Sequence, residues 1–471
     1  MTPPLAKVPS TSGVFSNSRR SATLPILWTY LLVLSLPFFG FSFLNLGGRG
    51  LLRADWAFAG LLVLAFAARV LADGKLRVGK TGTFVVALNV VALLSIHYLF
   101  SGNNDQFVNF LTFYAQLALM SLLFFAVSNL NVTDGQLKNI IRTWLFVAVL
   151  VGSYSIYEVI AVNLDLPLLT FHFTNPSIKA VGTPATILWN SRPGSFLPEP
   201  GYLGFVLTPP LIILTFLLIY VRDREVLFRS VWINWAIWVV LAGAVIVSQA
   251  FATYSVLLVT GLVAFGRLSH MPQRLAKLVV VIGAVLFLLV LFTNASIVEI
   301  YKPLVARLNS ITLGSDGSTQ ERLARAKVAL QIWADHPLLG VGFGNFEQAA
   351  ADVAPPAWYY QGQVTIDSSG SPWLGVLAEL GIVGFLAAAG VWLSMLLRLH
   401  RAARLARPAD YLSVILLALF YVVLADVIYL LQGGSLTAPQ RWFDLGLASL
   451  WFVHCRTQQQ SARLPANIGP P

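Results

Sequence analysis

Two arginines that could hold phosphate groups lie in the only long polar segment of a very apolar chain. Arg322 and Arg325 stand three residues apart, so on a helix their side chains leave the same face as neighbours. Planar guanidinium groups bind phosphate oxygens through paired hydrogen bonds. The pair could therefore hold a pyrophosphate. The alternative is a solvated basic helix face, paired with Glu321 or with lipid headgroups.

The helix that carries these arginines is predicted from its start signal and its periodicity. Ser318 followed by Glu321 forms a capping-box pattern, and Pro337 is predicted to end the helix. His336, at the predicted helix end, is a candidate base, although a histidine there is more often a cap. Apolar residues recur at spacings of three or four and predict the buried face: Leu323, Ala326, Leu330 and Trp333.

A glycine-rich run follows this helix. Gly340, Gly342 and Gly344 would let the backbone approach a ligand closely. The run lacks the lysine and hydroxyl residue of a nucleotide-binding loop, so it does not predict a nucleotide.

The elements that must position these residues are membrane helices. The chain is 57% hydrophobic and only 11% charged, which excludes an ordinary soluble globule. Apolar runs of about 20 residues recur, enough to cross a bilayer, and they do not alternate as barrel strands do. We predict an all-α polytopic membrane protein with about twelve transmembrane helices, near 24–43, 56–72, 82–100, 107–127, 143–161, 202–221, 231–248, 250–266, 278–294, 373–396, 411–431 and 442–455.

The orientation follows from the distribution of positive charge. Most of the 31 lysines and arginines fall on one set of short loops and on both termini, which are therefore predicted to be cytoplasmic. Orientation also explains the net charge of +11, so nucleic acid is not an expected partner. The first apolar run is long enough to remain an anchor rather than a cleaved signal peptide. The predicted regions are a disordered tail (1–20), spans one to nine (24–294) with an outer loop at 162–201, a periplasmic loop with its own helices (295–372), spans ten to twelve (373–455) and a cytoplasmic tail (456–471).

Carboxylates gather at the predicted outer ends of the helices. Acidic residues inside a membrane normally face a bundle interior or a wet cavity, although each could also cap or leave its helix end. We therefore predict a polar cavity in the outer half of the bundle, near Asp55, Glu158, Glu199, Glu379, Asp426 and Asp444.

Three segments resemble the O-antigen ligase and polysaccharide polymerase family. They are the segment from Arg322 through Ala329 to the run Trp333–Phe346 (WADHPLLGVGFGNF), then Trp373–Gly384 (WLGVLAELGIVG) and, more weakly, Ser191–Pro200 (SRPGSFLPEP). The resemblance covers about residues 185–390. It implies a metal-independent, cofactor-independent, inverting glycosyl transfer at the periplasmic face of the bacterial inner membrane, with a glycan on undecaprenyl pyrophosphate as donor. It also implies that Arg322, Arg325 and Arg192 bind the pyrophosphate, and that a histidine or carboxylate serves the acceptor hydroxyl.

Two departures from the family pattern affect the choice of reaction. Ligases of this family typically carry a His-Asn pair where this chain has Gly370 and Ser371, and an arginine is missing after Ser248. The departures favour a polymerase of lipid-linked repeat units over a ligase to lipid A core. They leave four candidate bases: Asp367, Glu379, His336 and Glu199.

Two alternatives of another class are a lipid-linked glycan transporter and a non-catalytic assembly subunit. No inverted repeat supports the transporter. The expected partners are the lipid-linked glycan and the bilayer, with a chain-length regulator and a flippase as candidate protein partners.

Overall fold

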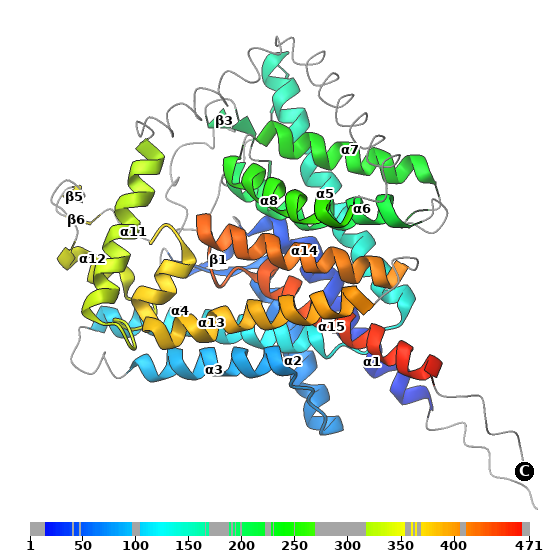
Figure 1. Cartoon of the computed structure of the whole chain (residues 1–471), viewed down its shortest axis with the longest axis horizontal. Helices are drawn as coiled ribbons and strands as arrows, with labels where there is room; N and C mark the ends of the chain where they lie inside the picture. Colours follow the sequence, from blue (N-terminus) through cyan, green and yellow to red (C-terminus); the bar gives the residue numbers. More distant parts are fainter. Residues whose placement is uncertain are drawn as a thin grey trace, which may run out of the picture.

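The computed structural model shows a bundle of long helices with a smaller helical part at one end (Figure 1). The structure describes residues 15–39, 42–46, 49–96, 104–164, 166–168, 188–189, 192–193, 195–197, 200–221, 228, 230–248, 250–268, 317–353, 359–360, 363–364, 369–405 and 411–463. The bundle comprises α1 (Phe15–Ser35), the short 3-10 helix η1 (Leu36–Phe38), α2 (Ala54–Asp73), α3 (Lys80–Leu94), α4 (Asn104–Ser128), α5 (Asp134–Asn163), α6 (Pro200–Tyr220), α7 (Val231–Ser248), α8 (Phe251–Leu268), α13 (Pro372–Leu405), α14 (Tyr411–Gln432) and α15 (Pro439–Arg463).

Strands are confined to three short antiparallel hairpins in the described residues. They are β1 (Ser42–Leu46) with β2 (Arg49–Arg53), β3 (Leu188–Trp189) with β4 (Arg192–Pro193), and β5 (Tyr359–Tyr360) with β6 (Gln363–Val364). None of them forms a larger sheet, so the chain is an all-α protein as predicted.

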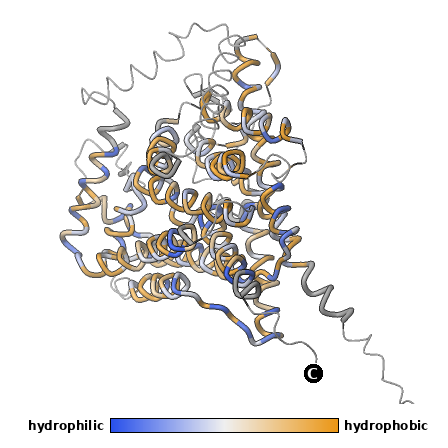
Figure 2. The backbone as a smooth tube through the Cα atoms, turned by 45° about the vertical axis from the view of Figure 1, so that its right-hand side comes forward, coloured by the Kyte–Doolittle hydropathy of each residue, from blue (hydrophilic) through white to orange (hydrophobic). Residues whose placement is uncertain are grey.

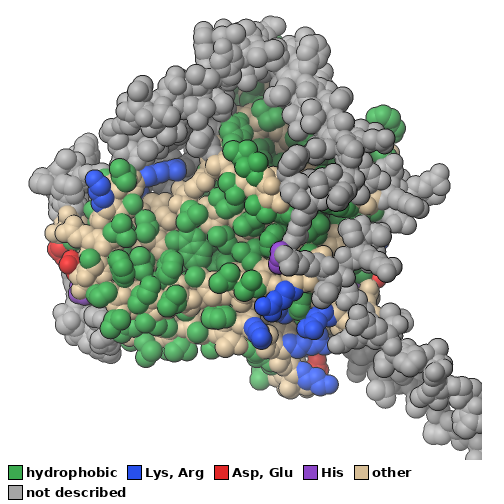
Figure 3. Space-filling view, in the orientation of Figure 1, with side chains coloured by type: hydrophobic (Ala, Val, Ile, Leu, Met, Phe, Trp, Pro, Cys, Tyr) green, Lys and Arg blue, Asp and Glu red, His purple; other side chains and the backbone are tan. Residues whose placement is uncertain are grey.

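The bundle is built for a membrane. Seven of the described helices are long and apolar enough to cross one, and three shorter apolar helices accompany them. Large apolar side chains stay exposed on the outside of the bundle, including Leu64, Trp232, Leu258 and Leu386, which an aqueous surface would disfavour and a lipid surface accepts. Figures 2 and 3 show hydrophobic residues along the bundle helices and over much of one face. The chain is therefore a polytopic membrane protein.

α6 and α14 form the interior of the bundle. Both are largely buried, and α14 packs against α6, α8, α13 and α15. Their sequences are apolar all round, as expected for helices that meet protein on every side. α13 in turn packs against α3 and α14, and the site described below is built around its first turns.

A helix lies at each predicted span that falls within the described residues, but several ends differ. α1 begins at Phe15, so residues 15–20 of the predicted tail are helical, and α15 continues to Arg463 into the other predicted tail. The first span ends early: η1 stops at Phe38 and β1 begins at Ser42, because Pro37 cannot continue the hydrogen-bond ladder. The predicted span 278–294 lies outside the described residues.

The predicted long loop contains two helices, α11 (Gly317–Asp335) and α12 (Phe346–Val353). They lie at the end of the bundle away from the C-terminus (Figure 1). Lys and Arg side chains gather at the lower right of the space-filling view, toward the C-terminal end (Figure 3). This arrangement agrees with the predicted asymmetry, while the number of spans and the side on which the termini lie stay predictions.

Most of the predicted outer-end carboxylates are buried. Asp55 pairs with Arg53, and the Glu158 carboxylate accepts a hydrogen bond from the Ser195 backbone N–H at 2.8 Å. Asp426, Asp444 and Arg441 form a charged cluster in which each residue is at most 1% exposed. Glu199 lies outside the described residues.

Candidate functional site

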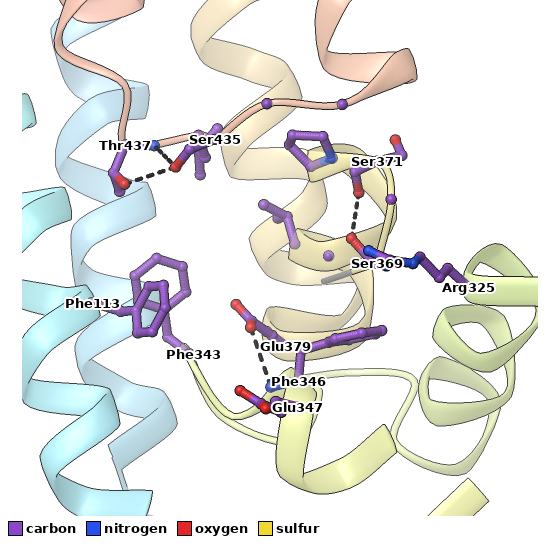
Figure 4. A pocket seen from close by; sticks show the side chains of 18 of the residues that line it. Phe113, Arg325, Phe343, Phe346, Glu347, Ser369, Ser371, Glu379, Ser435 and Thr437 are labelled. Atoms are coloured by element: carbon purple, nitrogen blue, oxygen red, sulfur yellow. Dashed lines mark hydrogen bonds between the residues drawn. The ribbon is translucent and has the colours of Figure 1, made fainter. Parts of the chain in front are cut away.

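A cavity of about 570 Å³ opens between the end of the bundle and α11. α4 contributes Asn109 and Phe113, and α11 contributes Arg322 and Arg325. The remaining walls are three segments that are distant in sequence but meet here (Figure 4): Phe343, Gly344, Phe346 and Glu347; Ser369–Pro372 with Gly375, Val376 and Glu379; and Gln432–Thr437.

The two arginines reach the cavity because α11 packs against α13. The buried face of α11 is Val328, Ala329 and Ile332, which form a small apolar cluster with Phe346, Ala350 and Ala378. The predicted stripe is only partly buried: Leu323 and Leu330 are 58% and 44% exposed, whereas Ala326 and Trp333 are intermediate. The packed face carries the small Ala329, whereas the larger Leu323 and Leu330 point away from it. For the predicted capping residues, Ser318 and Glu321, the structure describes the backbone but not the side chains.

The glycine-rich run is bound to a break in α13. Gly381 has φ 62° and interrupts the helix. The freed backbone groups pair with the run: Val341 and Gly342 donate to the carbonyls of Ala378 and Glu379 at 3.1 and 2.9 Å. Ile382 and Val383 donate back to Pro337 and Leu338 at 2.9 and 3.3 Å. The two family-like motifs are thus one structural unit, hydrogen-bonded in both directions.

The glycines in this unit permit contact between two backbones. A Cβ on Gly340 would lie 2.3 Å from the Glu379 carbonyl carbon, and one on Gly381 would lie 2.3 Å from Leu338 backbone atoms. Gly340 and Gly342 therefore meet protein backbone, rather than the ligand that the sequence predicted for them. Gly344 alone of the three lines the cavity.

This unit holds the Glu379 carboxylate at the cavity. Phe346 donates its backbone N–H to Glu379 Oε1 at 3.3 Å, and the Gly344 backbone makes a second hydrogen bond to the carboxylate. Glu379 is half-buried and faces the cavity (Figure 4). A second acid that the sequence did not single out, the exposed Glu347, lies on the same wall.

Gly370 and Ser371, which depart from the His-Asn pair that the resemblance led us to expect, also line the cavity. Gly370 has φ 72°, a conformation that L side chains rarely adopt. Ser369 Oγ donates to the Ser371 carbonyl at 2.6 Å, and Ser371 Oγ donates to the Leu430 carbonyl at 3.0 Å. The segment is fixed to α14 in a shape suited to glycine, so a histidine at position 370 would be strained.

The sequence-predicted residues separate into three groups. Arg322, Arg325, Glu379 and Gly344 come together at the cavity. His336 is exposed at the end of α11 and is not among the lining residues, so the helix-end interpretation fits it better than the role of base. Asp367 and Glu199 lie outside the described residues, and for Arg192 only the backbone, in β4, is described.

The sequence reasoning missed the wall formed by Gln432–Thr437. Its Gly433-Gly434 pair resembles any short connection between helices, and no residue within it carries a charge. The signal was in Arg441, a basic residue just inside an apolar helix, which the structure places directly against this segment.

Comparison with known proteins supports the resemblance noted above. Residues 252–389 match the family model described as O-Antigen ligase. No curated protein matches the chain. The matched region includes α8, α11, α12 and the first half of α13, and so it carries most of the charged side of the cavity. Residues 252–389 are therefore similar to the O-antigen ligase family, and they lie in a chain that is a multi-pass membrane protein.

Proposed function

We propose that the chain is a polysaccharide polymerase that joins glycan repeat units carried on undecaprenyl pyrophosphate, at the periplasmic face of the bacterial inner membrane. The observation that supports this most strongly is the cavity itself. It brings the two arginines of α11 and the Glu379 carboxylate of the family-like motif in α13 to one site at the end of a membrane bundle. A lipid-linked pyrophosphate can reach such a site from the bilayer, whereas the glycine-rich run lacks the residues that would hold a soluble nucleotide-sugar.

In this proposal Arg322 and Arg325 bind the pyrophosphate of the donor. Guanidinium groups neutralise the charge that develops on the leaving pyrophosphate, and such electrostatic stabilisation is often the largest contribution to catalysis. The acceptor hydroxyl oxygen attacks the anomeric carbon from the face opposite the pyrophosphate. The bond from that carbon to the pyrophosphate oxygen breaks, and lipid pyrophosphate leaves.

We assign the acceptor proton to Glu379, one of the candidate bases. It faces the cavity, and its carboxylate is oriented by two backbone N–H groups. A general base must lie within hydrogen-bond reach of the proton it removes. Of the two candidates whose side chains the structure describes, Glu379 lines the cavity and His336 does not. Glu347 is the second acid at the site and serves as the comparison in mutagenesis.

The residue type at position 370 supports polymerase over ligase, because glycine stands there in place of the histidine that the resemblance led us to expect. A ligase-type histidine at this position would need a left-handed backbone conformation, and no histidine occurs among the described residues that line the cavity. A ligase that moves finished glycan to lipid A core is the alternative outcome of the assay below. Transport without transfer, or an assembly role without catalysis, is a further outcome.

The test is a transfer assay with purified full-length protein in lipid nanodiscs and the lipid-linked repeat unit of its own host. We expect a ladder of products that each differ by one repeat. Arg322→Ala and Arg325→Ala are expected to lower kcat/KM by about 100-fold. Lys327→Ala is the matched control, since Lys327 is exposed on the same helix but does not line the cavity.

Three results would overturn parts of this proposal. A single addition to lipid A core, without a ladder, would show a ligase. Movement of lipid-linked glycan without new glycosidic bonds would show a transporter. Equal activity of the arginine variants and the lysine control would show that the arginines do not bind the pyrophosphate.

A further inference from the structure

The wall of the cavity formed by residues 432–437, here called the α14–α15 segment, is uncharged. It consists of Gln432, Gly433, Gly434, Ser435, Leu436 and Thr437. Ser435 and Thr437 lie across the cavity from Arg325 (Figure 4). The donor side of the cavity carries charge, and this side carries hydroxyl and amide groups. The two sides therefore suit different parts of a reacting pair.

We infer that the α14–α15 segment is the acceptor subsite, and that it binds the uncharged terminal sugar whose hydroxyl attacks the donor. The inference rests on the proposed function, because it assigns the second substrate to the same cavity. Hydroxyl and amide groups donate and accept hydrogen bonds, as sugar hydroxyls do. Neighbouring Asn109 adds an amide, and Phe113 packs edge-to-face on Phe343 at 6.4 Å to add an apolar surface for a sugar face.

The α14–α15 segment is held in place by hydrogen bonds within itself and to α4 and α8. Ser435 Oγ and Thr437 Oγ1 lie 2.9 Å apart, and Ser435 Oγ accepts from the Thr437 N–H at 3.1 Å. Thr437 Oγ1 also donates to Gln116 Oε1 of α4 at 3.2 Å. Gln432 Nε2 donates to Ser255 Oγ of α8 at 2.7 Å. A binding wall that is already ordered loses little entropy when ligand arrives.

A buried arginine supports the segment from behind. Arg441 donates from Nε to the Ser435 carbonyl at 3.1 Å and from Nη2 to the Gly433 carbonyl at 3.5 Å. It also donates from Nη1 to the Asp426 carbonyl at 3.1 Å, and its charge is balanced by the Asp426 carboxylate at 4.0 Å. A Cβ on Gly434 would lie 2.7 Å from Arg441 Nη2. The glycine pair thus lets the backbone pass over the guanidinium, and Arg441 is a positioning residue for the acceptor.

The test separates the two substrates kinetically. The assay uses the lipid-linked repeat unit as donor and the lipid-free oligosaccharide of one repeat as acceptor. Thr437→Val, which keeps the shape and removes the hydroxyl, is expected to raise the acceptor KM about tenfold and to leave the donor KM unchanged. Thr437→Ser should restore most of the acceptor affinity. Arg325→Ala should show the opposite split, with donor KM raised and acceptor KM retained.

A direct binding measurement keeps the inference independent of turnover. Saturation-transfer NMR with the lipid-free oligosaccharide should detect binding to the wild type, weaker binding to Thr437→Val and recovery in Thr437→Ser. Unchanged acceptor KM and unchanged NMR binding in Thr437→Val would overturn the inference, while wild-type transfer would leave the proposed function standing. Oligosaccharide binding that depends on Thr437, without any transfer by folded wild type, would instead reject the proposed function.

Discussion

Two glycine-bearing segments border the cavity, and they use glycine for different contacts. At Gly340 and Gly381 the missing side chains let one backbone lie on another, with virtual Cβ positions 2.3 Å from backbone atoms. At Gly434 the missing side chain lets the backbone lie on a guanidinium, with a virtual Cβ 2.7 Å from Arg441 Nη2. The first contact is between main chains of fixed shape. The second depends on a side chain that is held by buried charges.

This difference predicts separate sensitivities. The run at 340–344 holds Glu379 through hydrogen bonds between backbones, so changes of charge elsewhere should leave it intact. The α14–α15 segment is held through Arg441, whose buried charge is balanced by Asp426 and Asp444. Changes to that cluster should therefore disturb the acceptor side of the cavity and spare the base.

The largest expected effect comes from removing the buried guanidinium. Arg441→Ala leaves two carboxylates in the bundle without their cation, and loss of one partner of a buried pair costs about 3–5 kcal/mol. We expect a large drop in thermal unfolding temperature in detergent. Arg441→Met combined with Asp426→Asn and Asp444→Asn should recover part of the loss, because no unpaired charge remains. If Arg441→Ala is as stable as wild type, the charged cluster does not support the segment.

A smaller but still severe effect is expected at the break in α13. Gly381→Ala places a Cβ against Leu338 backbone and forces alanine to φ 62° and ψ −166°, a combination that is essentially restricted to glycine, which together should cost about 3 kcal/mol. The measurement is again the unfolding temperature, with Gly74→Ala as control. Gly74 has φ 62° and ψ 16° and no atom within 4 Å of its virtual Cβ, so it reports the cost of an ordinary left-handed conformation without a contact. If Gly381→Ala and Gly74→Ala lower the unfolding temperature equally, the close contact at Gly381 adds no cost.

The smallest effect is expected where a glycine of the same run meets a side chain. Gly344→Ala brings a Cβ to 2.7 Å from the Phe113 ring, and a ring at a cavity edge can move. The loss should stay near the backbone strain of about 1–2 kcal/mol, with narrower access to the cavity. We expect the rate of glycosyl transfer by Gly344→Ala to fall strongly, while its unfolding temperature falls only slightly. A loss of stability as large as that of Gly381→Ala would show that Phe113 is as fixed as backbone.

Most of the fold could be predicted from the sequence, because long apolar runs predict membrane-spanning helices. The helix ends were less accurate where a local residue decided them, as Pro37 does. The buried face of α11 was missed because Ala329 and Val328 are small and the larger Leu323 and Leu330 point outward. Periodicity of large residues did not reveal which face meets a partner helix.

The charged half of the site could be predicted from its motifs, and the uncharged half could not. Arg322, Arg325 and Glu379 were found from residue type and family resemblance, and they meet at one cavity. The pairing of Gly342 with Glu379 joins positions that no local pattern connects. The role of Gln432–Thr437 as a cavity wall depends on the hydrogen bond from Arg441 to the Ser435 carbonyl. That contact exists only in the folded chain, so the sequence did not reveal it.

The measurement that tests the central claim most directly compares Glu379→Gln with wild type and with Glu347→Gln in the reconstituted transfer assay. The Glu379→Gln substitution keeps the size of the side chain and removes the carboxylate that accepts the proton. The account predicts a product ladder from wild type, a rate lowered by about 100-fold or more in Glu379→Gln, an unchanged affinity for the lipid-linked donor and a smaller loss in Glu347→Gln. Wild-type rates in Glu379→Gln, or no lengthening by folded wild-type protein, would contradict it.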